Sequence, residues 1–250
     1  GNMGVYNTAT YGGKLYISGA SVIEYDPIAK TATTLENPEA DCPLIAFYRE
    51  RMFLAGKDNL WFASRAWNIS DFSFSDDSGD VSQPVAGRVD FGKITAMFPI
   101  QDRALVLATD RSIWLMNGDP VAGGTLQQIS NEVGMISYCV TPEGLVVFLA
   151  NYGLYLWQPG AGIPTPFSAE AIPAEMRDVD ATTNYVSMVY DHENRNVSLF
   201  VSPAVGRGKH WLVDLKNKAL WPMQFAADRQ PVVAASFGGR AIIAGMDGYL

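Results

Sequence analysis

The chain has 250 residues, of which 48% are hydrophobic and only 18% are charged, a balance that excludes an intrinsically disordered protein. Its net charge of −8 provides no diffuse positive field for a phosphate backbone. No apolar run approaches the roughly 20 residues that span a bilayer. We therefore expect neither nucleic acid nor a membrane as a partner.

One pattern recurs six times along the chain. It consists of a polar or glycine turn, four or five apolar residues, a short polar turn, and a second apolar segment that carries an aromatic residue. Successive copies start 37 to 52 residues apart, which brackets the roughly 40 to 50 residues of a propeller blade. The copies begin at Lys14 (KLYISGASVIEY), Arg51 (RMFLAGKDNLWFAS), Arg103 (RALVLATDRSIWLM), Glu143 (EGLVVFLANYGLYLW), Arg195 (RNVSLFVS, then KHWLVD) and Arg240 (RAIIAGMDGYL).

Further strands flank these copies and complete a four-stranded unit. A preceding strand is predicted at 5–10, 44–48, 94–99, 136–140, 185–190 and 232–237, and a following strand at 31–35 and 219–225. The first five copies have room for four strands, whereas the sixth ends near the start of its third. The pattern predicts an all-β fold, a β-propeller of five or six four-stranded antiparallel blades, over a single domain at 1–250. We expect this domain to belong to a longer protein.

Two other fold classes are less compatible with the sequence. The runs 104–108 and 145–150 are continuously apolar, which predicts strands buried on both faces, as in blades packed between neighbours. A β-sandwich, the second choice, would show cleaner alternation because one face of each sheet is wetted. An α/β fold needs helices between strands, and the one helical candidate, around 169–177, is interrupted by Pro173.

The sequence contains no recognisable catalytic, cofactor or metal motif. Cys42 and Cys139 lack the spacing of a redox or zinc pair, and we interpret them as buried thiols. The two histidines are too few for a zinc site or a triad; we expect His192 in a hairpin turn and His210 at a strand edge.

Three groups of side chains remain as weak site candidates. Trp67, Phe72 and Phe74 lie in the long connection after the second copy, where they either cap the core or form a partner interface. The acidic stretch 75–80 favours a solvated loop, with calcium binding at Asp76, Asp77 and Asp80, or an Asp box, as alternatives. The pairs Asp76/Asp77 and Asp178/Asp180 are also considered as the carboxylates of glycoside hydrolysis.

The segment from Leu44 to about Pro166 resembles structural proteins of tailed bacteriophages and prophages, of the head-tail stabilisation or tail-tube accessory kind. The resemblance lies in LIAFYRERMFLAGKDNLWFASRAWNISDF, ITAMFPIQDRALVLATDRSIWLMNGDP and ISNEVGMISYCVTPEGLVVFLANYGLYLW, and covers about half the chain. It implies a rigid propeller platform in the virion, assembled in the bacterial host cytoplasm. Its implied partners are other virion or tail proteins or copies of itself, and no family catalytic residue can be carried over.

Two functions from different classes follow. The first is a non-enzymatic assembly protein of a phage or prophage virion, acting in the head-tail or tail region through protein contacts. The alternative is a carbohydrate-binding or glycoside-cleaving propeller, which requires acidic and aromatic side chains to converge at the central mouth.

Overall fold

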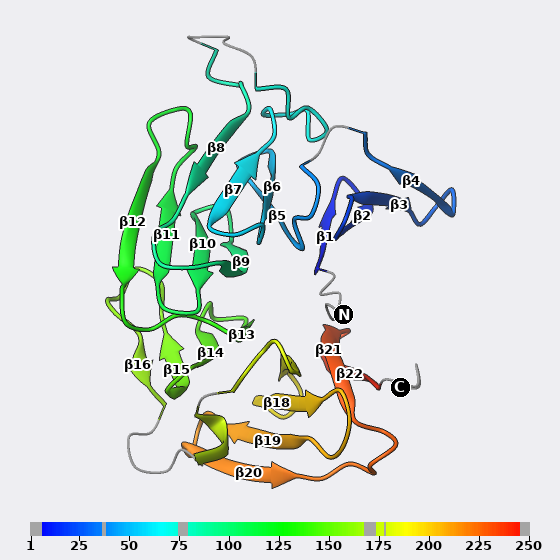
Figure 1. Cartoon of the computed structure of the whole chain (residues 1–250), viewed down its shortest axis with the longest axis vertical. Helices are drawn as coiled ribbons and strands as arrows, with labels where there is room; N and C mark the ends of the chain where they lie inside the picture. Colours follow the sequence, from blue (N-terminus) through cyan, green and yellow to red (C-terminus); the bar gives the residue numbers. More distant parts are fainter. Residues whose placement is uncertain (1–6, 37–38, 75–79, 168–173, 178, 246–250) are drawn as a thin grey trace. The chain divides into compact units, whose positions relative to one another are not determined.

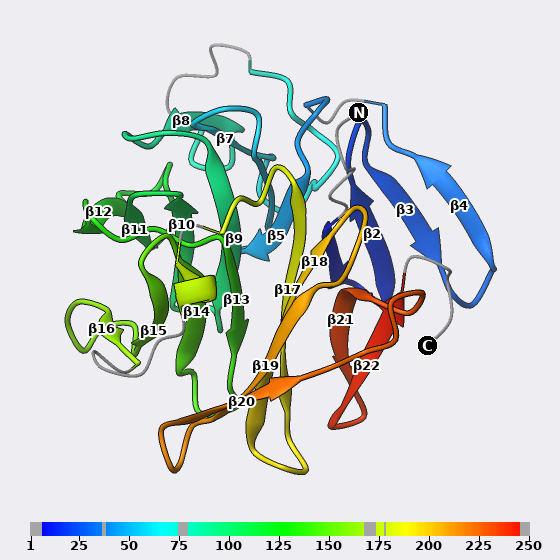
Figure 2. The same cartoon turned by 60° about the horizontal axis from the view of Figure 1, so that its bottom comes forward.

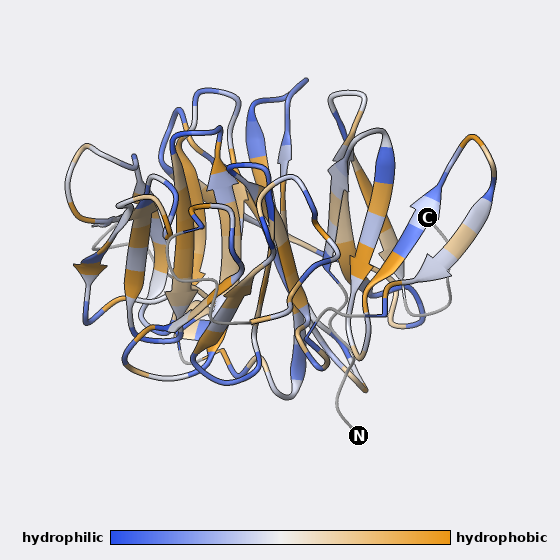
Figure 3. Cartoon of the chain, turned by 90° about the horizontal axis from the view of Figure 1, so that it is seen from above, coloured by the Kyte–Doolittle hydropathy of each residue, from blue (hydrophilic) through white to orange (hydrophobic). Residues whose placement is uncertain are grey.

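The computed structural model describes residues 7–36, 39–74, 80–167, 174–177 and 179–245. These residues form five four-stranded antiparallel sheets, each a simple meander, and one two-stranded sheet. The chain divides into two compact units, one ending at Gly134 and the other starting at Met135, and every sheet lies wholly within one unit. Figure 3 shows that strands carry most of the hydrophobic colouring and that many loops are hydrophilic.

The first unit holds three sheets. β5, the first strand of the second sheet, lies against both β1 and β9, the first strands of the other two, and Figure 1 shows β9 to β12 beside β5 to β8. The strands are β1 (Asn7–Tyr11), β2 (Lys14–Ser18), β3 (Ile23–Asp26), β4 (Thr31–Thr34), β5 (Leu44–Tyr48), β6 (Arg51–Ala55), β7 (Leu60–Ala63), β8 (Val85–Arg88), β9 (Ile94–Ile100), β10 (Ala104–Thr109), β11 (Ile113–Asn117) and β12 (Thr125–Ser130).

The middle sheet of this unit is buried on both faces. Along β6, Met52 and Leu54 enter the cluster shared with the first sheet, while Phe53 and Ala55 enter the cluster shared with the third. Successive side chains of a strand point to opposite faces, so a strand between two cores must be apolar at every position. This explains the unbroken apolar runs of the sequence, and the six residues of β10 are likewise all buried.

The second unit holds two four-stranded sheets and the two-stranded one. β17 lies against both β13 and β21, and these strands stand side by side in Figure 2. A cluster that includes Val147, Leu149, Leu199 and Trp211 fills the space between the two larger sheets. The strands are β13 (Ser137–Val140), β14 (Val146–Ala150), β15 (Gly153–Trp157), β16 (Thr165–Pro166), β17 (Asn184–Asp191), β18 (Asn196–Pro203), β19 (Lys209–Asp214), β20 (Ala219–Met223), β21 (Pro231–Phe237) and β22 (Arg240–Gly245).

The predicted repeat is confirmed: each of the first five copies supplies part of a four-stranded sheet. The sixth supplies the two-stranded sheet of β21 and β22 within the described residues. The predicted strand at 44–48 has the bounds of β5, and the one at 5–10 begins at Asn7, because residues 5 and 6 lie outside the description. Of the helical candidate at 169–177, the described part contains one 3-10 turn at Ala174–Met176.

Candidate interaction site

Arg51, the first residue of β6, is fully buried and fixes the long connection between β7 and β8. Its Nε donates to Asp119 Oδ2 at 2.8 Å, which neutralises the buried charge. Buried charges are tolerated only when they are paired and fully hydrogen-bonded. The remaining donors reach backbone carbonyls at 2.7 to 3.1 Å, those of Ser64, Val81, Ser82 and Gln83. Arg51 thereby ties both ends of the connection to the sheet.

A second arginine braces the same connection nearer its surface. The Arg65 guanidinium donates to Asp71 Oδ2 at 2.8 Å and to Asp80 Oδ2 at 2.6 Å. Backbone hydrogen bonds, from Ser73 to Asp71 and from Ser82 to Asp80, and the Arg65 contacts lower the pKa of both carboxyl groups. Both acids are therefore ionised at neutral pH, and they hold the two halves of the connection together through one cation.

Trp67 lies in the turn between Arg65 and Asn68, within the segment that these two arginines fix. Its indole is 75% exposed, yet its backbone is in the left-handed region at φ 60° and its N–H donates to the Glu50 carbonyl at 2.9 Å. The left-handed conformation is strained for a residue with a Cβ and persists only where the surroundings impose it. Here Glu50 belongs to the tight turn between β5 and β6, in which Arg49 and Glu50 both have positive φ.

The structure separates the three aromatic candidates of this connection. Phe72 is 5% exposed and packs in the cluster with Phe62 and Ile45, so it caps the core, one of the two predicted roles. Phe74 is 46% exposed, with its ring 6.3 Å from that of Phe62. Only Trp67 stands largely free of the core. We call the described residues 64–74 and 80–84, which Arg51 and Arg65 fix, the Trp67 loop.

The acidic stretch falls largely outside the description. Asp76, Asp77 and Asp178 are among the residues that the structure does not describe. Asp80 accepts hydrogen bonds from Arg65 and Ser82, and Asp180 accepts from Thr182. In the part of the chain that is described, no three His, Cys, Asp or Glu side chains are grouped to hold a metal ion.

The remaining predictions have mixed outcomes. Cys42 and Cys139 are buried free thiols, as predicted, and burial raises the pKa of Cys42 to about 11. His192 lies in the turn between β17 and β18, also as predicted. The strand-edge prediction for His210 is wrong, because β19 pairs with strands on both sides and the ring is 2% exposed.

His210 belongs to a buried polar network that sequence reasoning missed. Gln230 Oε1 lies 2.9 Å from His210 Nε2 and also accepts from the Gly208 N–H at 2.7 Å. The rings of Phe200 and Phe225 flank the imidazole, and burial lowers the pKa of His210. No local motif could reveal this network, because Gln230 is 20 residues away from the histidine and precedes a different sheet.

Comparisons with known proteins extend the description of the fold. No protein-family model matches the sequence, and no curated protein matches it. A chain of a mitotic checkpoint complex is similar in structure with a TM-score of 0.62 and 11% identity, over 97% of this chain and 71% of that one. The protein YCF48 bound to a D1 peptide is similar with a TM-score of 0.62 and 13% identity. That match covers 98% of this chain and 77% of the YCF48 chain.

A third similar structure is the dihydro-heme d1 dehydrogenase NirN, with a TM-score of 0.56 and 12% identity. The match covers 94% of this chain, which spans about half, 49%, of that one. At such low sequence identities the similarity supports a shared fold but no shared activity. Together with the sheet topology they define the class: the chain has an all-β propeller fold with five four-stranded antiparallel blades. Among the described residues, no helix has the length and hydrophobicity to cross a membrane.

Proposed function

We propose that this chain is a non-enzymatic protein-interaction scaffold and that its partners bind at the Trp67 loop. The observation that carries the proposal is the exposed Trp67 indole on a backbone fixed by Arg51, Arg65 and the Glu50 carbonyl. Tryptophan is enriched among the few residues that dominate binding energy. A loop that is already ordered loses little conformational entropy on association, which favours its use as a contact.

We further propose that the partners are structural proteins of a phage or prophage particle, or copies of this chain. This part of the proposal depends on the resemblance of the segment from Leu44 to about Pro166 to tailed-phage structural proteins. The chain would then be made in the bacterial host cytoplasm and retained in the virion. The scaffold role and the virion role are separable, since a propeller can serve as a platform in many assemblies.

Quantitative co-purification tests the scaffold role. Tagged wild-type protein, Trp67→Ala and Trp221→Ala are expressed in the native host, and the co-purifying proteins are compared by mass spectrometry. Trp221 is the matched control, because it is also an exposed tryptophan, 59% accessible, on the outer strand β20. We expect Trp67→Ala to lose at least one partner that Trp221→Ala keeps. Equal partner sets for all three proteins would contradict the proposal.

The virion role has its own test. Particles purified from an induced host culture are separated by density and analysed by mass spectrometry. The proposal predicts this chain at a fixed ratio to the tail proteins across the particle fractions. Its absence from intact particles would refute the virion role and leave the scaffold role unaffected.

A further inference from the structure

The connection between β20 and β21, residues 224–230, is held against the hairpin of β18 and β19 by the Gln230 side chain, which is 5% exposed. Its Nε2 donates to the Ala226 carbonyl at 2.6 Å and to the Phe225 carbonyl at 3.3 Å. Its Oε1 accepts the Gly208 N–H at 2.7 Å. These contacts fix which end of the amide is the oxygen, so it is this oxygen that lies 2.9 Å from His210 Nε2.

The hydrogen bond between Gln230 and His210 defines the protonation state of the imidazole. An amide oxygen only accepts hydrogen bonds, so His210 Nε2 carries the proton that joins the two side chains. In the neutral ring the other nitrogen, Nδ1, then has no proton, and it is buried without a hydrogen-bond partner among the described residues. A second proton, at Nδ1, would create a cation whose new N–H has no acceptor.

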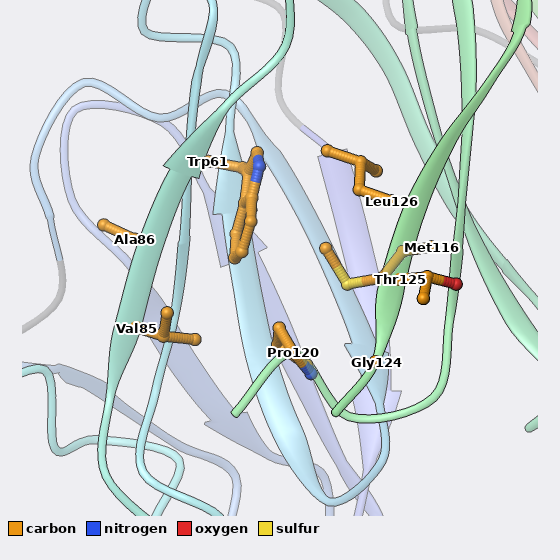
Figure 4. Close-up of a pocket in the computed structure, with 8 residues that line it drawn as sticks. All are labelled: Trp61, Val85, Ala86, Met116, Pro120, Gly124, Thr125 and Leu126. Atoms are coloured by element: carbon orange, nitrogen blue, oxygen red, sulfur yellow. The ribbon is translucent and has the colours of Figure 1, made fainter. Parts of the chain in front are cut away.

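One other buried side-chain nitrogen in the described part of the chain lacks a partner, Trp61 Nε1. Figure 4 shows this nitrogen on the indole, among the residues that line a pocket in the first unit. The two atoms differ in chemistry, because an indole N–H is a donor only, whereas an imidazole gains a proton near pH 6.5. Of the two, only the His210 nitrogen can therefore respond to mild acid.

The surroundings of the imidazole are apolar. The ring centroids of Phe200 and Phe225 lie 5.8 and 5.2 Å from that of His210, and Met223 is its paired residue on β20. β18 and β20, which flank β19, carry no charged or titratable residue, and neither does β21, which packs against β18. An added proton would thus find no counter-charge on the neighbouring strands.

The charged residues of the adjoining segments are exposed. Arg207 and Lys209 flank Gly208, and Asp228 and Arg229 lie in the connection that Gln230 closes. Asp214, at the far end of β19, is engaged with Asn217 in the next turn. Burial accordingly lowers the pKa of His210, and the hydrogen bond from Gln230 opposes this only in part.

β21 itself is held by contacts that do not titrate in this range. The Ser202 hydroxyl donates to the Pro231 carbonyl, and Ser187 Oγ accepts the Ala234 N–H at 2.9 Å. A second proton on His210 therefore weakens the hold on the connection, whereas the hold on β21 stays intact.

We propose that His210 and Gln230 form a pH-sensitive latch, which keeps the connection between β20 and β21 closed while the ring is neutral and releases it when Nδ1 takes up a proton. Release brings the imidazolium and the Gln230 amide into water, where both find partners. The closed form binds the second proton more weakly than the open form, so a falling pH favours opening. The latch is independent of the interaction role of the Trp67 loop.

Amide hydrogen exchange of the wild-type chain, followed in ¹H–¹⁵N spectra, tests the latch. Protection factors, which correct for the pH dependence of exchange itself, are compared between about pH 7.5 and 5.5. The Gly208 N–H, bound by Gln230, should lose up to about tenfold in protection per pH unit below about 6.5, whereas the Ala234 N–H, bound by Ser187, should keep its protection. Constant protection of Gly208, or parallel losses at both amides, would overturn the proposal.

Two variants and one spectrum complete the test. His210→Gln cannot take up the proton and should make the protection of Gly208 independent of pH, while His192→Gln, in the turn between β17 and β18, should retain the wild-type loss. The imidazole ¹⁵N signals of the wild-type chain at about pH 7.5 should show a protonated Nε2 and an unprotonated Nδ1 for His210. A proton on Nδ1 would overturn the proposal even if His210→Gln fails to fold.

Discussion

Arg51 and Asp119 form an ion pair of 2.8 Å across 68 residues of sequence, with the arginine side chain wholly buried and the aspartate side chain 20% exposed. The pair joins the start of β6 to the connection between β11 and β12. One buried cation therefore joins the Trp67 loop to the connection between β11 and β12.

Replacing Arg51 should strongly reduce the free energy of unfolding. Arg51→Met removes the partner of Asp119 and one donor from each of four backbone carbonyls, and breaking such a buried pair typically destabilises by about 3–5 kcal/mol. Urea unfolding measures the loss. Arg111→Met is the control, because the Arg111 side chain is 75% exposed and should change stability by less than about 0.5 kcal/mol. Similar values for both variants would contradict the structural role of Arg51.

The buried role of Arg51 depends on contacts between distant parts of the chain. In the sequence Arg51 resembles Arg103 and Arg195, polar turn residues at the start of a copy, and its partner Asp119 lies 68 residues away. The strands themselves could be predicted, because a blade between two cores must be apolar at every position, as β10 and β14 are. The unpartnered Trp61 nitrogen and the exposure of Trp67 depend on three-dimensional neighbours and could not be predicted.

Stability should fall in mild acid through His210. Burial lowers its pKa in the folded state below the ordinary value of about 6.5, so the folded protein favours the neutral ring. The unfolded chain takes up the proton first as the pH falls below about 6.5, and unfolding becomes easier, by up to about 1.4 kcal/mol per pH unit. Urea midpoints between pH 7.5 and 5 measure this loss.

The two histidines allow a controlled version of that experiment. His210→Gln should reduce the loss of stability between pH 6.5 and 5, whereas His192→Gln, in an exposed turn, should retain it. An identical acid response in both variants would show that other groups cause the loss.

The Trp61 Nε1 has no hydrogen-bond acceptor, so replacing Trp61 and replacing Trp157 should destabilise the fold by different amounts. Trp61→Phe removes a donor that has no acceptor, while Trp157→Phe leaves the Gly162 carbonyl without its donor. Gly162 is exposed, so water can replace the lost donor, and Trp61→Phe should be less destabilising by about 0.5–1.5 kcal/mol, the net worth of one hydrogen bond. Chemical unfolding of the two variants gives the difference directly. A Trp61→Phe variant that is the less stable of the two would mean that the indole nitrogen has an acceptor.

Gly87 should tolerate no side chain, although its backbone is not left-handed. The Cβ of Gly87→Ala would lie 2.3 Å from Trp61 Cζ2, which forces the indole or β8 to move. Overpacking of this kind costs about 1–3 kcal/mol, and the Trp61 indole signal should shift. Arg88→Ala, exposed on the same strand, serves as the control and should leave both the midpoint and the signal unchanged. An equally small effect of Gly87→Ala would contradict the close packing of the indole.

Site-specific photo-crosslinking tests whether a partner binds at the Trp67 loop. A photoreactive phenylalanine derivative replaces Trp67 in one variant and Ile28, which is 93% exposed in a turn of the same unit, in the other. After irradiation in the native host, we expect one dominant crosslinked protein at position 67 and none at position 28. Equal, diffuse crosslinking at both positions would contradict an interaction role for Trp67.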